Sequence, residues 1–186
     1  MDYYIISPPK GQAHKIANYI HKGLSARGKS AFCLDYTDME RLQMVPCRAC
    51  CIALSPVCYG QHLKDVTGQV RSICRKNPLL YVALLSVSLS ARSLKVRHKS
   101  PQLDQWKEEC SVDTILCEAI AGRLTPMTFP WPMRPFVRLW FRFVLKRSDG
   151  SQFVELTDWR QVDAVIETIV YRANIKAEFE FRKSVA

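Results

Sequence analysis

The first segment of the chain whose residue types and position suit binding chemistry follows a short apolar run, Tyr3 to Ile6. It consists of Ser7, Pro8, Pro9, Lys10, Gly11, Gln12 and Ala13. Apolar residues at helical spacing come next, and the start of a helix offers free backbone N–H groups and a positive dipole end that bind phosphate. Pro8 and Pro9 remove two such donors, and Lys10 supplies a positive charge in their place. The segment is therefore either a phosphate-binding loop or a rigid turn.

Two other segments have side chains that suit a planar ligand. After the most apolar run come Ser86, Val87, Ser88, Leu89, Ser90, Ala91 and Arg92, with three hydroxyls and a cation for a polar rim. Pro56, Tyr59 and Gly60 lie in an expected turn, where the tyrosine can stack on a ring and the glycine lets the backbone approach it. Loops with the same residues are often only solvated, so both interpretations, a ligand-binding loop and a solvated loop, stay open.

A segment from Trp131 to Arg147 combines regular cations with bulky apolar residues. The cations at every fourth position are Arg134, Arg138, Arg142 and Lys146. On a helix they form one stripe, and the apolar arc covers about two thirds of the circumference. Such a helix is covered by a second surface or lies on a lipid interface, while its apolar runs are too short for the roughly 20 residues of a membrane span.

Other kinds of chemistry find little support in the sequence. The four histidines have no serine or cysteine partner in a recognisable nucleophile setting, so we expect no hydrolase triad. Cys47 and Cys50 form a CxxC without a second ligand pair, and we expect no metal site. Most of the eight cysteines lie in apolar runs, and no signal peptide precedes the first strand, so we expect a cytoplasmic protein.

Composition indicates one globular domain with anionic partners. The chain has 186 residues, 48% of them hydrophobic, and a formal net charge of +10. This excess of positive charge favours phosphates, carboxylates, nucleic acid or anionic lipid as partners. The basic residues follow no nucleic-acid-binding motif, so we expect no nucleic-acid partner.

Alternating strands and helices must position these segments. We predict strands over residues 3–6, 31–34, 50–54, 79–87 and 114–121, and a short one over 153–156. Helices are predicted over residues 16–24, 63–76 and 102–110 and from Trp159 to about Arg172, with Thr157 or Asp158 as the last N-cap. This order predicts an open α/β sheet of five parallel strands with helices on both faces, which binds ligands beyond the carboxyl ends of its strands. The domain is expected over residues 1–175, with an insertion at about 123–152 that carries the basic amphipathic helix, before a loose charged tail over 176–186.

Over residues 3–172 the chain resembles a known family. The matching segments are Gly11-Gln12 with Ile16-Ala17, Tyr59-Gly60, Ser86-Val87 through Ala91-Arg92, Ile120-Ala121-Gly122, Thr157-Asp158-Trp159 and the inserted basic-aromatic helix. Together they are similar to the menaquinone-dependent protoporphyrinogen oxidases, flavodoxin-like flavoproteins of haem biosynthesis.

The resemblance implies an FMN-dependent enzyme that oxidises protoporphyrinogen IX to protoporphyrin IX and passes electrons to a membrane quinone. It places residues 7–13 around the flavin phosphate, and residues 55–60 and 86–92 beside the isoalloxazine ring. The cations of the inserted helix would contact substrate propionates or an anionic membrane surface. The protein would then lie in the cytoplasm, peripherally associated with the inner face of the cell membrane.

A second hypothesis keeps the fold and changes the function. Pro8 and Ala13 stand where the family has hydroxyl residues that bind phosphate. A relative with weakened or lost FMN binding would act as a porphyrin-binding or membrane-binding protein.

Overall fold

The computed structural model describes residues 1–58, 60–92, 97, 100–124, 131–133, 135–136, 139 and 154–185. Its centre is an open sheet with parallel strands β1 (Tyr3–Ser7), β2 (Ala31–Asp35), β3 (Cys50–Cys58), β5 (Tyr81–Ser88) and β6 (Thr114–Ala121). The strands follow the order β2-β1-β3-β5-β6, and each neighbouring pair is parallel. The predicted open parallel sheet is confirmed.

The structure also has several short elements. They are β4 (Gln61–His62), η1 (Ser90–Arg92), β7 (Arg123–Leu124), η3 (Trp131–Met133) and β8 (Val154–Glu155). Strand β4 pairs antiparallel with the end of β3, and β7 pairs antiparallel with β8. The β7–β8 pair thus joins the two ends of the segment that the sequence predicts to be an insertion.

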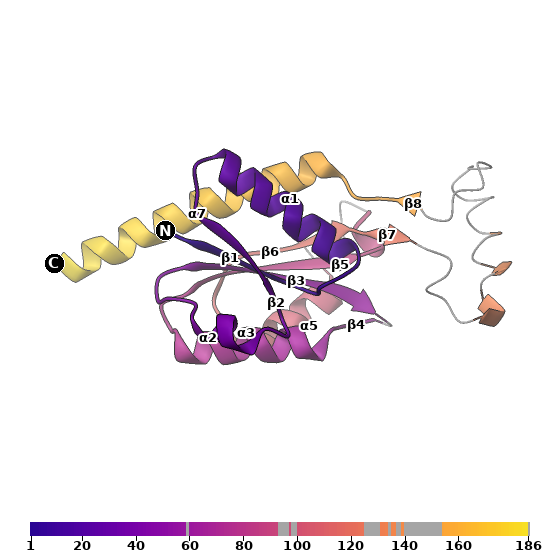
Figure 1. Ribbon diagram of the computed structural model, residues 1–186, viewed down its shortest axis with the longest axis horizontal. Helices are drawn as coiled ribbons and strands as arrows, with labels where there is room; N and C mark the ends of the chain where they lie inside the picture. The colour runs from indigo at the N-terminus through magenta and orange to yellow at the C-terminus, as the bar shows by residue number, and fades with distance from the viewer. Residues whose placement is uncertain are drawn as a thin grey trace.

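Helices cover both faces of the sheet (Figure 1). One face carries α1 (Gln12–Ala26) and α7 (Trp159–Val185), and the other carries α2 (Met39–Gln43), α3 (Lys64–Lys76) and α5 (Pro101–Cys110). Each face has its own hydrophobic core. Strand β5 is buried over seven consecutive residues, because it contacts both cores, and this explains its uninterrupted apolar sequence.

Helix α1 forms because its apolar residues recur on one side. Ile16, Ile20 and Leu24 have no exposed surface and pack against the sheet and α7. Fully burying each such side chain contributes about 1.5–3 kcal/mol. The chain leaves the helix at Gly28, whose φ of 68° suits glycine.

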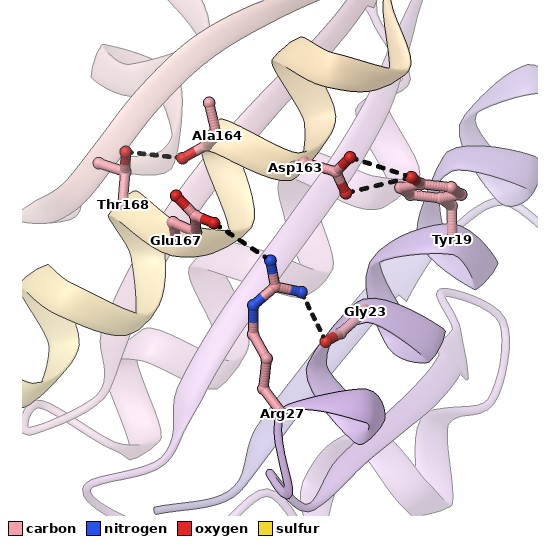
Figure 2. A network of polar contacts seen from close by, with 7 residues as sticks. All are labelled: Tyr19, Gly23, Arg27, Asp163, Ala164, Glu167 and Thr168. Carbon is pink, nitrogen blue, oxygen red and sulfur yellow. Dashed lines mark hydrogen bonds and ion pairs between the residues drawn. The ribbon is translucent and has the colours of Figure 1, made fainter.

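Polar contacts join α1 to α7, as Figure 2 shows. The Tyr19 hydroxyl donates to both carboxylate oxygens of Asp163, at 3.1 and 3.2 Å. The Arg27 guanidinium lies 3.4 Å from the Glu167 carboxylate and donates to the Gly23 carbonyl oxygen at 2.9 Å. These contacts fix how the two helices are placed along each other.

Strand β3 is longer than the sequence predicted. The expected strand ended at Leu54, with Pro56 in a loop, but pairing with β5 continues until Pro56 lies opposite Val87. The pairing of β3 with β1 ends at Ala53, so the last part of β3 no longer lies between two parallel neighbours. Proline, which has no N–H, is tolerated there for this reason.

The C-terminal segment also differs from the prediction of a helix to about Arg172 and a loose tail. Helix α7 continues to Val185, so the prediction of a loose tail is wrong over residues 176–185. No glycine or proline interrupts this segment. Tertiary contacts also hold it, because Lys176 lies 2.7 Å from the Asp113 carboxylate and the Tyr81 hydroxyl donates to Glu180 at 2.8 Å. The predicted domain boundary at residue 175 therefore falls inside α7.

Candidate functional site

The carboxyl edge of the sheet is the candidate site. In the strand order β2-β1-β3-β5-β6, the chain moves from β1 to one side of the sheet and then returns to the other side at β3. Loops at such a switch point diverge and leave a crevice outside the carboxyl ends of the strands, where ligands bind. The segments predicted to bind a phosphate and a ring follow β1, β3 and β5, and so lie along this edge.

The first of these segments ends in a helix terminus without a side-chain cap. Gly11 is the N-cap of α1, has a φ of 91° and provides no side-chain hydrogen bond. The first turn contains no acidic residue. Its backbone N–H groups and the helix dipole therefore favour an anion. Pro9 and Lys10 are exposed beside this terminus, whereas the Ala13 side chain is 2% exposed and belongs to the core, so only its backbone is available to a ligand.

Two side chains of this segment are engaged within the protein. The Ser7 hydroxyl is buried at the end of β1 and donates to the carbonyl oxygen of Pro8, itself buried, at 3.3 Å. The Gln12 amide nitrogen donates to Glu155 Oε1 at 2.5 Å and to Thr157 Oγ1 at 2.8 Å. A ligand at this helix terminus would therefore meet backbone donors more than side-chain donors.

Glu155 joins the start of α1 to the start of α7. Its second oxygen lies 2.9 Å from the Lys15 ammonium. Burial alone would raise the pKa of this carboxyl, but hydrogen bonds from Thr157 and Lys15 and the charge of Lys15 together lower it. The ionised Glu155 thus neutralises Lys15 next to the α1 terminus. No local sequence signal predicts these contacts, because the partners are more than 100 positions apart.

The segment after β3 forms a hairpin instead of the expected open loop. Pro56 lies in the strand, and Gly60, with a φ of 81°, is exposed in the turn to β4. The Ser55 hydroxyl accepts a hydrogen bond from the Leu63 N–H at 3.1 Å and so fixes the return of the chain. Tyr59 lies outside the described residues.

Within this hairpin, the buried His62 of β4 contacts the end of β5. His62 Nε2 lies 2.8 Å from the Ser86 hydroxyl oxygen, and its ring stacks on Trp106 at a centroid distance of 4.4 Å. Ser86 is 1% exposed and Val87 is 5% exposed. Burial lowers the pKa of His62 to about 4, so the ring is neutral near pH 7. The sequence reasoning did not select His62, since a lone histidine gives no signal of this pairing.

The remaining residues after β5 form the turn η1. The hydroxyls of Ser88 and Ser90 lie 3.1 Å apart, and Leu89 is 41% exposed at the edge. Ala91 is fully buried against Ala119 and Ala121, so it packs under the edge. Arg92 closes η1, but its side chain lies outside the part of the structure described.

Several predicted contact residues cannot be placed. Arg134, Arg138, Arg142 and Lys146 all fall outside the described residues, and so does most of the predicted cationic helix. In the described part of the chain, no helix combines the length and apolar content that crossing a membrane needs. Substrate or membrane contact by these cations stays a prediction.

The cysteines are all free thiols. Burial raises the pKa of Cys50 and Cys110 to about 12 and that of Cys74 and Cys117 to about 11, so these groups are neutral near pH 7. Among the described residues, no three histidine, cysteine, aspartate or glutamate side chains are grouped as metal ligands.

No protein-family model matches the sequence, and no curated protein matches it. Among solved structures, a flavone reductase superposes with a TM-score of 0.50 at 11% identity, over 97% of this chain and 64% of that chain. The rubredoxin oxygen:oxidoreductase of Desulfovibrio gigas gives 0.49 at 12% identity, over 95% of this chain, which spans only 36% of that protein. A two-electron reduced flavodoxin of Megasphaera elsdenii gives 0.47 at 13%, over 64% of this chain and 85% of that one. At these identities the likeness extends to the fold alone, and the strand order β2-β1-β3-β5-β6 makes that fold flavodoxin-like.

Proposed function

We propose that the chain is an FMN-dependent oxidoreductase whose cofactor lies at the carboxyl edge between β1 and β3. The uncapped start of α1 beside the switch point is the observation that carries this proposal. Its first-turn N–H groups and Lys10 would hold the phosphate, and the exposed residues Gly60 and Leu89 would lie beside the ring. Bound FMN would supply the electron-accepting chemistry, while this chain would bind and orient cofactor and substrate.

The charges at the α1 terminus suit an anion. The nearby Glu155 carboxylate is paired with Lys15 and with the Gln12 amide, so its negative charge is compensated. Lys10 is exposed and adds a positive charge. A dianionic phosphate therefore gains more from this terminus than a neutral hydroxyl group does.

The proposed reaction is the oxidation of protoporphyrinogen IX to protoporphyrin IX, with electrons passed to a membrane quinone. The sequence resemblance supports this choice of substrate. The net charge of +10 suits the propionates of a porphyrin and an anionic membrane surface. The protein would then act in the cytoplasm, peripherally at the inner face of the cell membrane.

A flavin-binding experiment tests the first step. The full chain is purified from riboflavin-replete cells, its visible spectrum is recorded, and it is titrated with FMN and with riboflavin. FMN should bind near stoichiometry and more tightly than riboflavin, because only FMN carries a phosphate. Lys10→Glu should weaken FMN about tenfold or more and riboflavin little, whereas Lys22→Glu, an exposed site farther along α1, should change neither. Absence of stoichiometric flavin after FMN addition would exclude the proposal.

Turnover is tested separately. Protoporphyrinogen IX oxidation is followed by porphyrin fluorescence with FMN-loaded protein, with and without a quinone. Oxidation that depends on both FMN and quinone is expected. FMN binding without porphyrinogen consumption would keep the flavoprotein and reject this substrate.

A second candidate function is a porphyrin-binding or membrane-binding relative that has lost tight FMN binding. It is favoured by the hydroxyl of Ser7 and the amide of Gln12, which are engaged within the protein. Porphyrin binding without flavin-dependent turnover would support this candidate over the enzyme.

A further inference from the structure

A cavity lies at the amino edge of the sheet, at the opposite end of the strands from the candidate site. Its volume is about 360 Å³, and it lies where the end of α3, the turns before β5 and β6 and the second half of α7 meet. This volume is near the lower end of the range of about 300–1,000 Å³ for ligand pockets, so the cavity suits a small organic molecule. The proposed FMN site does not use it.

Part of the cavity lining is apolar. Leu80, Val82 and Cys110 line it and are buried. Cys74 also lines it, and burial raises the pKa of the Cys74 thiol to about 11 and that of Cys110 to about 12. Both thiols are therefore neutral near pH 7 and act as small apolar groups. This part of the lining suits the apolar body of a ligand.

Three cations also line the cavity. They are Arg71 and Arg75, which lie one turn apart on the same side of α3, and Lys176 of α7. The Arg71 guanidinium donates to the Glu109 carbonyl oxygen, which fixes its position. In the described part of the chain, no carboxylate pairs with Arg71 or Arg75. Guanidinium groups bind carboxylates through parallel hydrogen bonds, so these two arginines suit an anionic group.

Two carboxylates limit how much negative charge the cavity accepts. Asp113 lies 2.7 Å from the Lys176 ammonium, and this hydrogen bond lowers the pKa of the carboxyl, so the pair is ionised and neutral as a whole. Glu180 accepts a hydrogen bond from the Tyr81 hydroxyl at 2.8 Å. The lining thus has three cations against two carboxylates, an excess of one positive charge. A monoanion balances this excess, whereas a dianion would leave uncompensated negative charge beside Glu180.

We propose that this cavity binds a small organic molecule with one carboxylate and an apolar body. The carboxylate would contact Arg71 and Arg75, and the apolar body would pack on Leu80 and Val82. Helix α7 forms one wall of the cavity, and its contacts with Asp113 and with β5 hold this wall in place before the ligand binds. The proposal goes beyond the FMN-dependent activity, because the two sites lie at opposite edges of the sheet and share no residue.

Benzoate is the probe for this site, and nuclear magnetic resonance of the nitrogen-15-labelled full chain measures its binding. Benzoate should shift backbone amide signals within residues 74–80 and 110–113 and leave those of residues 10–13 unchanged. Benzamide has the ring without the charge, acetate has the charge without the ring, and phenyl phosphate is a dianion. Each should bind this cavity at least tenfold more weakly than benzoate. Equally tight binding of benzamide or of phenyl phosphate would overturn the proposal.

A charge reversal tests the role of the arginines. Arg75 is exposed, so Arg75→Glu should fold, which circular dichroism checks, and it should raise the dissociation constant of benzoate at least tenfold. Lys22→Glu makes the same change in net charge at an exposed position of α1 and should leave the dissociation constant unchanged. Equal effects of the two variants, or no shift within residues 74–80 and 110–113 at about 10 mM benzoate, would reject the site. Saturating FMN should not change benzoate binding, so a failure at one site is distinguishable from a failure at the other.

Discussion

The helices of the two layers of this protein are held to one another by different proportions of polar and apolar contacts. The layer of α1 and α7 combines an apolar core with polar contacts between the helices, such as Tyr19 with Asp163 and Arg27 with Glu167 (Figure 2). On the other face, α3 and α5 pack through a core that includes the fully buried Trp106, and one hydrogen bond joins them, from the Arg71 guanidinium to the Glu109 carbonyl oxygen. No salt bridge links α3 to α5 in the described part of the chain.

The difference in contacts between the two layers corresponds to a difference in what each layer positions. The α1 and α7 layer carries the uncapped helix terminus, and Glu155 and Thr157 tie the starts of both helices together. Directional hydrogen bonds set the position of one helix along another, and α1 and α7 have more of them than α3 and α5 in the described part of the chain. The α3 and α5 layer mainly supplies buried surface, so its contribution to stability should be larger than its contribution to the site.

Removing Trp106 should have the largest effect. Trp106→Ala deletes a fully buried ring and its stacking on His62, and should lower the free energy of unfolding by about 3–5 kcal/mol. Urea denaturation followed by circular dichroism measures the change. Gln105→Ala, on the exposed side of the same helix, is the control and should stay within about 1 kcal/mol of the wild type. A loss below 1 kcal/mol for Trp106→Ala would contradict the role given to this layer.

Acid should destabilise the same layer through His62. Its folded pKa of about 4 lies below the ordinary value of 6.5, so between these pH values the unfolded chain binds a proton that the folded chain excludes. Stability should therefore fall as the pH drops from 7 to 4, by about 3 kcal/mol from this residue. His62→Gln should lower stability at pH 7 and flatten this slope. If the free energy of unfolding depends on pH in the same way in both proteins, the lowered pKa of His62 is contradicted.

Cutting a buried polar contact of α7 should have an intermediate effect. The Gln161 amide donates to Glu118 Oε1 at 2.8 Å and to the Ala119 carbonyl oxygen at 3.1 Å. Gln161→Ala leaves these acceptors without that donor and should cost about 1–3 kcal/mol in thermal or urea unfolding. Arg160→Ala, at the exposed neighbouring position, should be nearly neutral. If both substitutions lower the free energy of unfolding equally, the loss comes from a change at the start of α7 and not from the Gln161 hydrogen bonds.

The exposed ion pair between α1 and α7 should contribute least. Arg27→Ala and Glu167→Ala should show a coupling of about 0.2–1 kcal/mol in a double-mutant cycle, because the Glu167 side chain is 71% exposed. The coupling should shrink in 1 M salt. A coupling above 2 kcal/mol that salt does not reduce would place this pair among the main stabilising contacts and remove the distinction between the layers.

Local patterns predicted the elements that depend on neighbouring residues. The apolar run of β5, the spacing in α1 and the start of α7 were all found, and the Asp158 carboxylate accepts from the Gln161 N–H as an N-cap does. The ends of two elements, which depend on distant partners, were predicted too early. Pro56 extends β3 because β5 lies beside it, and α7 runs beyond Arg172 because Tyr81 of β5 and Asp113, just before β6, contact its second half.

The candidate site shows the same division. Its place at the carboxyl edge, and the residues after β1, β3 and β5, follow from the order of the elements along the chain. The order of the elements does not show which side chains remain free for a ligand. Ser7, Gln12 and Ser86 were predicted contacts, yet each already has a hydrogen-bond partner within the protein.

By itself, the sequence determined the class of fold, the number of parallel strands and the edge at which the candidate ligand-binding segments lie, because periodicity and turn residues act over a few positions. Only the tertiary structure decided that Glu155 meets Lys15, that His62 is neutral under Trp106 and that α7 has a second apolar side facing solvent. These properties depend on burial and on contacts between residues distant in the chain, and both arise only once the layers have packed.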